Sequence, residues 1–428
     1  MDDKADVIII GGGIVGCAAA YYLAKRGVRP VLFEKGRIAG EQSSRNWGFV
    51  RQQGRDPAEI PLMMASNRIW QGLEKDIEAD LDWTQEGNLV AAETKERLGE
   101  FEEWLEIAKL HQLDSRIVTP REIERLIPGI RPNAVGALYT PSDGHAEPEK
   151  AAPAIARAAE RLGAVVHANC AVLGIERSGG AVSGVVTERG AVRAGAVVCA
   201  SGAWASRLLR TIGVNLPQLW MRGTVARTAP VPRTVSKMGV WSGVAFRQRR
   251  DGSLNIAAGT TADHDVMLDS LLQAPAFLSA FRKHSSYLKL HFNKALTQHF
   301  AGRFSQAAFE RELLRFRTLD PPANPRLVAE ATAKLRYAFP DLASVPIAKT
   351  WAGYIDFTPD LIPVIDRLDD PRGLVIATGL SGHGFGMGPI MGKLVSELVI
   401  DGKPSLDLHA LRLARFSDGT KIESRNVI

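Results

Sequence analysis

Cysteine is scarce in this chain of 428 residues, which contains only Cys17, Cys170 and Cys199. Cysteines this few and this far apart cannot form a disulfide framework, and none lies near another Cys or His at the spacing of metal ligands. The small number and wide spacing of the cysteines exclude a disulfide scaffold and a zinc-type site. We therefore expect buried thiols in a reducing compartment, and no bound metal.

Long apolar runs are also missing. No stretch reaches the roughly 18 uninterrupted apolar residues of a membrane-spanning helix. The acidic start Met1–Asp6 has the wrong charge pattern for a signal peptide. The net charge of +6 is spread along the chain, and no nucleic-acid-binding motif accompanies it. We expect a cytoplasmic protein that does not bind nucleic acid and whose membrane contact is at most peripheral, on the inner membrane face.

The first forty residues contain a complete dinucleotide-binding unit. A β-branched run, Val7–Ile10, leads into Gly11–Gly16, a small-residue helix over Cys17–Arg26 and a second strand that ends at Glu34. A carboxylate at this strand tip can accept hydrogen bonds from both ribose hydroxyls of an adenosine. The order of these parts favours nucleotide binding over an ordinary strand-turn-helix corner, but it does not distinguish NAD from FAD.

The glycines of this unit have separate physical roles. Gly11 permits the tight turn, Gly13 lets the backbone approach a pyrophosphate, and Gly16 allows the helix to pack closely on the strand. The amides of Ile14 and Val15, at the start of the helix, lack intrahelical acceptors and lie at the positive end of the helix dipole. We therefore expect a phosphate to lie there.

The nucleotide-domain pattern returns twice more along the chain. It occupies residues 1–40, 145–215 and 365–428, which leaves residues 41–144 and 216–364 to fold beside it. Such interleaving is unusual for NAD dehydrogenases, whose nucleotide unit is normally continuous. Alternation from Gln218 to Thr261 predicts an antiparallel sheet. A tract at about 264–318 is predicted as a helix pair on that sheet, and a docking surface for a partner is the less favoured interpretation.

Four stretches together resemble the D-amino-acid oxidase superfamily of flavoproteins, which includes glycine oxidase, sarcosine oxidase and the D-amino-acid dehydrogenases. They are Gly11–Lys35, Ser43–Gly48, Val197–Trp204 and Trp351–Gly388. The resemblance implies an α/β fold in which a Rossmann-like FAD-binding domain of the glutathione-reductase type is interleaved with an α+β substrate domain. The discontinuous nucleotide segments would form the FAD-binding domain, and the tract at 264–318 would be an insertion in the substrate domain.

The resemblance and the glycine unit together imply a set of FAD-binding residues. In that family Val172 is the strand position that holds adenine through backbone atoms. His383 could donate to a flavin oxygen or satisfy its own loop, and Pro389 is expected to begin the last helix. The full set is Gly11, Gly13, Ile14, Val15, Gly16, Glu34, Lys35, Ser43, Ser44, Arg45, Asn46, Trp47, Val172, Ser201, Gly202, Gly382, His383, Gly384, Phe385, Gly386 and Met387.

The chemistry implied is hydride transfer from a carbon that bears an amine nitrogen to the flavin, which gives an imine that water hydrolyses. FAD would carry the difficult step, so no catalytic triad or metal is required. The substrate would be a small amine or amino acid. Two alternatives remain open: oxidation of a 2-hydroxy acid or glycerol phosphate at the same site, and a non-catalytic flavin subunit of an electron-transfer complex that docks through residues 264–318.

Two carboxylate-binding residues of better-known members are missing. The arginine that often clamps the substrate is replaced by Ile355, and a lysine of sarcosine oxidase is replaced by Gly386. Arg51 is our first candidate for a replacement, because its spacing from the Ser-Ser-Arg stretch matches a substrate-binding arginine of sarcosine oxidase. Arg222 is the second candidate. Either arginine could instead lie at the surface or face phosphate.

Other departures concern oxygen and the flavin linkage. Sarcosine-oxidase-like enzymes place a lysine over the flavin to activate oxygen, and its approximate equivalent here is Asn255. Without that charge, superoxide would be less stabilised, so we expect a dehydrogenase that passes electrons to a quinone or a partner protein. Gly353 stands about where sarcosine oxidase attaches flavin through cysteine, so FAD is expected to be non-covalent. Tyr354 completes the substrate-side candidates.

Overall fold

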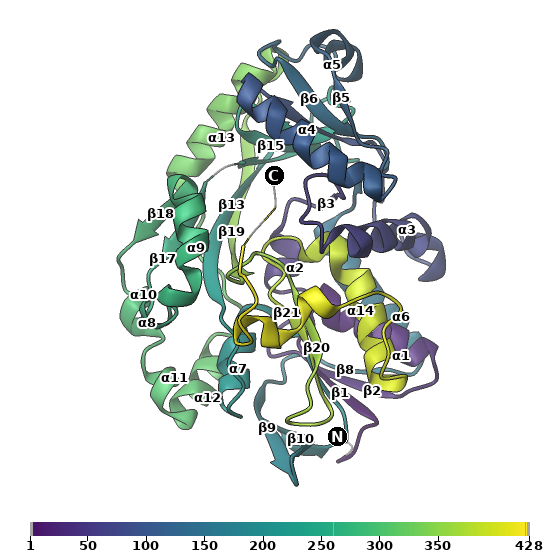
Figure 1. The fold of residues 1–428 in the computed structure, drawn as a ribbon, viewed down its shortest axis with the longest axis vertical. Coiled ribbons are helices and arrows are strands. Elements are labelled where there is room, and N and C mark those ends of the chain that lie inside the picture. The colour runs from purple at the N-terminus through teal and green to yellow at the C-terminus, as the bar shows by residue number, and fades with distance from the viewer. Residues whose placement is uncertain (1–2, 260, 424, 426–428) are drawn as a thin grey trace.

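The structure is a computed structural model that describes residues 3–259, 261–423 and 425. Residues 1, 2, 260, 424 and 426–428, which fall within the predicted domain ranges, lie outside the described residues. In the lower half of Figure 1, six strands form one sheet in the order β20-β21-β12-β1-β2-β8. They are β1 (Val7–Ile10), β2 (Pro30–Phe33), β8 (Val165–His167), β12 (Val197–Cys199), β20 (Val364–Arg367) and β21 (Leu374–Thr378).

This sheet confirms the predicted Rossmann-like unit. All neighbouring strands run parallel except β20, which is antiparallel to β21. The four residues of β1 are buried, as expected for a central strand covered on both faces. Strands from the beginning, middle and end of the sequence therefore lie side by side in one sheet.

Helices cover one face of the sheet, and a small sheet covers the other. Helix α1 (Ile14–Lys25) packs between α6 (Pro148–Arg161) and α14 (Gly384–Ile400), and α3 (Ile60–Asp76) packs on α14 (Figure 1). A Cβ at Gly392 would lie 2.4 Å from the Cβ of Ala18, so α14 approaches α1 too closely for any side chain there. The opposite face carries β9 (Val172–Ser178), β10 (Ala181–Thr187) and β11 (Gly190–Arg193).

The start of α14 differs from the prediction. We expected a loop up to Gly388 and a helix beginning at Pro389, but α14 begins at Gly384 and contains Pro389. A proline leaves a carbonyl of the preceding turn without its usual partner. Packing on α3 holds this first part of α14, since Ser66 Oγ (2.5 Å) and Trp70 Nε1 (2.9 Å) both donate to the carbonyl of Gly386, next to the Phe385 carbonyl that lacks the N–H of residue 389. The tertiary packing thus extends the helix by more than one turn.

A larger, ten-stranded sheet forms the second layer, and its longest strands, β13 and β19, pair antiparallel over their whole length (Figure 1). Most pairs are antiparallel as predicted, but β4 with β14 and β17 with β18 are parallel. The strands are β4 (Asn88–Ala92), β5 (Arg116–Val118), β6 (Gly136–Thr140), β13 (Leu219–Thr228), β14 (Met238–Trp241), β15 (Val244–Gln248), β16 (Leu254–Ala258), β17 (Ala262–Asp265), β18 (Leu288–His291) and β19 (Ile347–Phe357).

The remaining elements flank this sheet. Helix α13 (Pro325–Ala338) packs on β13, β15 and β16, and α4 (Lys95–Leu110) and α5 (Pro120–Leu126) pack on β6. Two short strands, β3 (Phe49–Val50) and β7 (Gly144–His145), form a separate pair. Helices α2 (Gln42–Arg45) and α7 (Ala205–Arg210) complete the connections.

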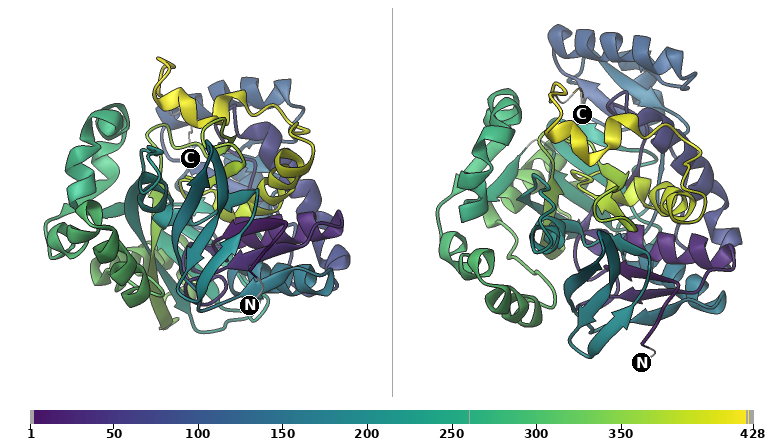
Figure 2. Two further views of the ribbon diagram at one scale, coloured as in Figure 1. Left: turned by 90° about the horizontal axis from the view of Figure 1, so that it is seen from below. Right: turned by 60° about the horizontal axis from the view of Figure 1, so that its bottom comes forward.

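The tract at 264–318 is not the predicted helix pair. It contains five short α-helices, one 3-10 turn (Ser285–Tyr287) and the strand β18, which pairs with the edge strand β17. The alternation of Leu288 and Leu290 with Lys289 and His291 has the period of a strand, and the open edge of β17 supplies the backbone partners. The helices are α8 (Leu268–Leu272), α9 (Ala274–His284), α10 (Ala295–Gln298), α11 (Ala301–Phe304) and α12 (Gln306–Arg315). Figure 2 shows this segment on the outer side of the molecule in two further views.

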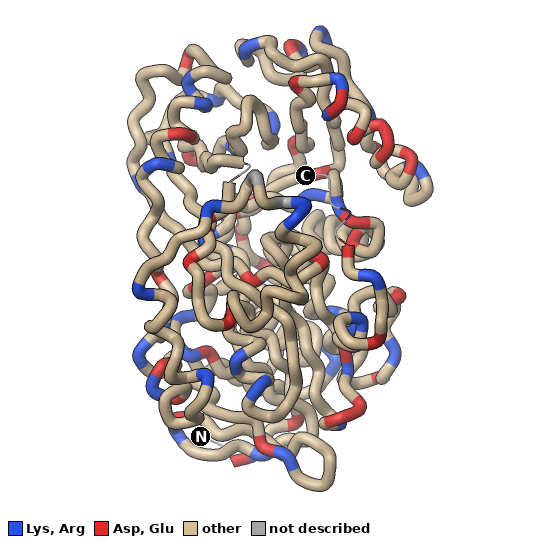
Figure 3. The backbone as a smooth tube through the Cα atoms, turned by 60° about the vertical axis from the view of Figure 1, so that its left-hand side comes forward, with Lys and Arg blue, Asp and Glu red and all other residues tan. Residues whose placement is uncertain are grey.

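The distribution of charge and the length of the apolar helices were both predicted from the sequence. In the view of Figure 3, basic and acidic residues are interspersed along the chain. No helix in the described ranges combines the length and the apolar character needed to cross a membrane.

Candidate active site

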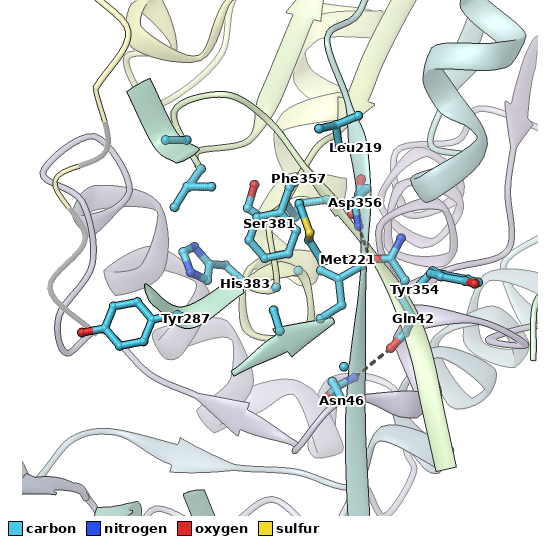
Figure 4. A pocket seen from close by; sticks show the side chains of 18 of the residues that line it. Gln42, Asn46, Leu219, Met221, Tyr287, Tyr354, Asp356, Phe357, Ser381 and His383 are labelled. Carbon is cyan, nitrogen blue, oxygen red and sulfur yellow. Dashed lines mark hydrogen bonds between the residues drawn. The ribbon is translucent and has the colours of Figure 1, made fainter. Parts of the chain in front are cut away.

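A cavity of about 1270 Å³ lies where the two large sheets meet. The N-termini of α1 and α14, the helix α2, the strands β13 and β19, and the helix α9 all contribute to its wall. Figure 4 shows Met221, Phe357, Ser381 and His383 gathered in one part of it. The volume exceeds the roughly 300–1,000 Å³ of an ordinary small-molecule pocket, so the cavity has room for more than a small substrate.

The predicted site residues divide into two groups. Those that line the cavity are Gly13, Ile14, Val15, Ser43, Arg45, Asn46, Trp47, Arg51, Gly202, Tyr354, Gly382, His383, Gly384 and Phe385. Those outside its lining are Gly11, Gly16, Glu34, Lys35, Ser44, Val172, Ser201, Gly386, Met387, Arg222 and Asn255. Gly386 and Met387 are withdrawn from the cavity because α14 begins earlier than predicted.

The glycine loop has no room for side chains. Gly11 has φ +109°, and a Cβ there would lie 2.5 Å from the carbonyl oxygen of Ala200. A Cβ at Gly16 would lie 2.0 Å from the carbonyl oxygen of Gly11. Backbone therefore packs on backbone, and Gly13 faces the cavity directly in front of α1. This is the bare, amide-rich surface that a pyrophosphate requires.

Glu34 is held by the loops on both of its sides. Its carboxylate accepts hydrogen bonds from the amides of Gly12 (2.8 Å) and Gly36 (2.7 Å). Burial raises the pKa of Glu34, while these two amides act in the opposite direction. The amide of Cys170 donates to the backbone carbonyl of Glu34 at 2.8 Å, which places Val172 at the start of β9 close to this strand tip. Glu34, just after β2, and Val172, the first residue of β9, thus lie near each other.

The Ser-Ser-Arg stretch forms one helical turn, α2. Ser43 Oγ accepts a hydrogen bond from the amide of Ile14 at 2.9 Å, and so occupies a first-turn donor of α1. Ser44 Oγ donates to a carbonyl within its own loop. Arg45 pairs with Asp320 and donates to the carbonyl of Ala352, so its guanidinium ties α2 to β19. These contacts position the N-terminus of α1 beside β19.

The neighbouring residues fix the same corner. Asn46 donates to the carbonyl of Gln42 at 3.2 Å (Figure 4), and the carbonyl of Trp47 accepts from Arg247. The carbonyl of Gly202 accepts from Gln218 Nε2 at 3.1 Å. These polar contacts hold Asn46, Trp47 and Gly202, which line the cavity, to neighbouring elements.

Lys35 and Ser201 make contacts away from the cavity. Lys35 Nζ contacts Glu41 and donates to the carbonyl of Phe316 at 2.7 Å, which links the nucleotide loop to the segment after α12. Ser201 Oγ lies 3.3 Å from the sulfur of Cys199.

Four charged or titratable side chains lie together at the N-terminus of α14. Arg51, Arg55 and His383 line the cavity, and Glu59 lies behind them with its side chain fully buried. His383 Nδ1 lies 2.8 Å from Glu59 Oε1. Arg55 Nη1 and Glu59 Oε2 are buried without a hydrogen-bond partner among the described residues. The imidazole of His383 therefore bonds a carboxyl group at the start of α3 rather than a group of its own loop.

Burial and the charges within this cluster shift the pKa values of Glu59 and His383. Burial raises the pKa of Glu59 to about 7, although Arg55 and Arg51 oppose the shift. Burial, aided by Arg55 and Arg51, lowers the pKa of His383 well below its usual value. The imidazole is consequently neutral at physiological pH, and the carboxyl group lies near the middle of its titration.

The other three substrate-side candidates are arranged differently. Arg222 lies 3.6 Å from both Asp263 and Asp265 and does not line the cavity, whereas Arg51 does. Asn255 accepts from Arg227 at 3.3 Å within the sheet, also outside the lining. Tyr354 lines the cavity and donates to Asp265 at 2.9 Å. Of the two arginine candidates, only Arg51 opens on the cavity.

Two residues of the cluster were missed by sequence reasoning. Arg55 and Glu59 follow Arg51 at intervals of four, just before the apolar face of α3 begins. Two arginines and a glutamate so close to an amphipathic helix were the available signal. No cluster of three or more His, Cys, Asp or Glu side chains arranged for a metal ion occurs in the part of the chain that the structure describes.

Comparison with known families agrees with this architecture. Residues 6–398 match the family model DAO, described as FAD dependent oxidoreductase. The chain belongs to the DAO family. FAD is therefore its cofactor.

Relatives of this DAO-family chain include amine- and amino-acid-oxidising enzymes. Human mitochondrial sarcosine dehydrogenase is 27% identical over 97% of the chain but only 42% of its own length, so the chain spans less than half of that relative. Sarcosine oxidase subunit beta from an Arthrobacter species is 27% identical, over 98% of the chain and 92% of its own length.

Solved structures also resemble the DAO-family chain. L-amino acid deaminase from Proteus myxofaciens superposes with a TM-score of 0.91 at 28% identity, covering 98% of this chain and 95% of its own. L-proline dehydrogenase from P. horikoshii superposes with a TM-score of 0.82 at 26% identity, covering 99% and 100%. These likenesses confirm the fold over the whole described chain.

Proposed function

We propose that this protein is an FAD-dependent dehydrogenase that oxidises the C–N bond of an amine or amino acid. The observation that carries the proposal is one cavity onto which the N-termini of two helices and the side chain of Arg51 all open, in a chain of the DAO family. The names of its relatives, which act on amines and amino acids, support the same reaction class.

We propose that FAD lies along the path from Glu34 to the N-terminus of α14. Residues 1–40, 145–215 and 365–428 would form its domain, and residues 41–144 and 216–364 the substrate domain. The pyrophosphate would lie at Gly13 and the N-terminus of α1, the ribose at Glu34, and the isoalloxazine ring in the rest of the cavity. None of Cys17, Cys170 and Cys199 lines that cavity, which supports non-covalent binding.

A substrate carboxylate would bind Arg51, with Arg55 beside it. Arg55 Nη1 is buried without a partner, and a buried guanidinium N–H that lacks an acceptor favours an incoming anion. A bidentate arginine matches the geometry of a carboxylate. The proposal leaves Arg222 in its ion pairs with Asp263 and Asp265.

Bound FAD would accept a hydride from the substrate carbon, and the protein would supply orientation and exclude water. The cavity wall contains Leu219, Met221 and Phe357, which present apolar surface, as well as the polar side chains of Arg51 and His383. Water that later enters would hydrolyse the imine. Tyr354, hydrogen-bonded to Asp265, would hold one side of the cavity in position.

Electrons would leave for a quinone or a partner protein rather than for oxygen. Asn255, which the sequence makes the approximate equivalent of the oxygen-activating lysine, is uncharged, accepts from Arg227 and lies outside the cavity lining, so it supplies no positive charge there. The mouth of the cavity is bordered by α9, where Leu278 and Phe281 are each 46% exposed. An exposed apolar rim suits an apolar acceptor or a protein surface.

Anaerobic mixing of the FAD-loaded protein with panels of D- and L-amino acids, N-methyl amino acids, simple amines and 2-hydroxy acids tests the reaction class. We expect amines or amino acids to bleach the flavin absorbance. Bleaching by hydroxy acids alone would replace the proposal with the 2-hydroxy-acid alternative, and bleaching by none would support the flavin-subunit alternative. In air we expect slow reoxidation, whereas rapid recovery with peroxide release would identify an oxidase.

Glu34→Gln tests the assignment of the ribose site. We expect the dissociation constant of FAD to rise about 10- to 100-fold, because the amide replaces a charged acceptor worth about 1.5–3 kcal/mol with a group whose NH₂ opposes the amide of Gly12 or Gly36. Fluorescence titration of the apoprotein with FAD measures this change. The matched control is Glu124→Gln, at an exposed position on α5. Equal FAD affinity in the wild type and Glu34→Gln would remove Glu34 from the site.

A further inference from the structure

The pairing of Glu59 with His383 has no role in the function proposed above. Glu59 comes from the start of α3 and His383 from the N-cap of α14, 324 residues apart in the sequence. Both side chains are shielded, since Glu59 is 0% and His383 11% exposed. A carboxyl group removed from water and bonded to an imidazole is costly to maintain, and His383 lines the cavity where a substrate would lie.

The hydrogen bond determines which nitrogen of His383 is free. When Glu59 is ionised it can only accept, so the proton of the neutral imidazole lies on Nδ1 and points at Glu59 Oε1. Nε2 then carries a lone pair and has no hydrogen-bond partner among the described residues. Because His383 lines the cavity, that lone pair is available to a bound ligand.

The charges around the pair explain why the imidazole is not already protonated. Arg51 and Arg55 face it from the loop before α3 and disfavour a second positive charge. The acidic groups nearby are engaged elsewhere: Asp360 bonds Arg415 at 2.7 Å, and Asp143 accepts the backbone amide of Gln52 at 2.7 Å. A carboxylate bound at the two arginines would neutralise them and so make His383 more basic.

We propose that His383 takes the proton of the substrate ammonium group through Nε2, with Glu59 as the countercharge, and that docking of the substrate carboxylate at Arg51 and Arg55 activates this base. This inference rests on the proposed oxidation of an amine. An N–H bond of the substrate breaks, a proton bonds to Nε2, and the electron pair stays on the substrate nitrogen. The resulting imidazolium faces the Glu59 carboxylate, and the neutral amine is ready to lose hydride.

The step requires an ionised Glu59. The pKa of Glu59 is about 7, so the pair loses its countercharge as the pH falls through this region, and the proton transfer should be lost with it. In Glu59→Gln the amide oxygen can still accept from Nδ1, but the charge is gone. The imidazolium is then unfavourable, and deprotonation depends on the substrate's own ionisation at high pH.

The experiment follows anaerobic flavin reduction at subsaturating substrate between pH 6 and 10, with the best amino acid of the panel. In the wild type the rate should rise with pH and reach a plateau near or above pH 7. In Glu59→Gln the rise should move by at least one unit to higher pH, so that the rate falls at least tenfold at pH 7 and recovers near pH 10. Glu124→Gln should follow the wild type throughout.

A second variant and a binding measurement separate this role from simple support of the fold. His383→Asn removes the base and should show the same loss at pH 7 and recovery near pH 10, so either variant suffices if the other loses its flavin. Equilibrium binding of (methylthio)acetate, in which sulfur replaces the amine nitrogen, should change less than twofold in Glu59→Gln, as followed by the flavin spectrum.

The outcomes distinguish the inference from the proposed function. If amines reduce the wild-type flavin but the pH profile of Glu59→Gln matches that of the wild type, the base assignment is overturned and amine oxidation stands. If Glu59→Gln loses rate equally at every pH, Glu59 supports structure only. If no amine reduces the wild type, both proposals fall together.

Discussion

Replacing Arg51 with methionine is expected to raise the Michaelis constant for a carboxylate-bearing amine about 30- to 1,000-fold, with a smaller change in kcat. The expectation follows from the position of Arg51 on the cavity wall beside Arg55. Loss of one partner of a shielded charged pair costs roughly 2–4 kcal/mol. Methionine keeps most of the apolar length of the side chain, so the lost contribution is the guanidinium.

Two comparisons make this result specific. Arg121→Met, at an exposed position on α5, should leave the Michaelis constant unchanged. The corresponding amine without a carboxylate should be oxidised by the wild type and by Arg51→Met with similar Michaelis constants. An Arg51→Met enzyme that keeps the wild-type constant for the amino acid would assign the carboxylate to another residue.

Gly16→Ala is expected to abolish FAD binding and to lower the stability of the fold. The added Cβ would lie 2.0 Å from the carbonyl oxygen of Gly11, a distance that real atoms do not reach. Helix α1 would have to move away from β1, and Gly13 and Ile14, which line the cavity at its N-terminus, would move with it. Flavin absorbance per molecule of purified protein and thermal unfolding measure the two effects.

Gly72→Ala is the matched control, because Gly72 also lies inside a helix, α3, and a Cβ there meets no atom within 4 Å. It should raise stability by about 0.5–1 kcal/mol through the better helix propensity of alanine. The contrast isolates the steric clash from helix propensity. Normal flavin content in Gly16→Ala would show that the loop tolerates a side chain and that its glycines have another purpose.

Local chemistry was enough to predict the nucleotide-binding half of this protein. The strand Val7–Ile10, the glycine loop and Glu34 lie within a few tens of residues, and each is specified by its neighbours: β-branched residues for the strand, missing side chains for the turn and a carboxylate at the strand tip. In the structure the amides of Gly12 and Gly36 donate to the carboxylate of Glu34. Both contacts lie within this one short unit.

Long-range packing decided where the predictions were wrong. Helix α14 begins at Gly384, five residues before Pro389, where Ser66 and Trp70 on α3 bond the carbonyl of Gly386. Strand β18 forms because the edge of β17 is open to it. Sequence periodicity reports the neighbours of a residue along the chain, and in both cases the deciding partner came from another element.

The sequence by itself determined the family resemblance, the cofactor and the interleaved order of segments, because all three depend on short motifs and on where they recur. Only the tertiary structure decided which candidates meet at the cavity. It brought Arg51 to the wall, paired Arg222 with two aspartates, and joined His383 to Glu59. The physical reason is that a buried charge takes the partner that the packing of distant helices and strands provides, and no local pattern records that partner.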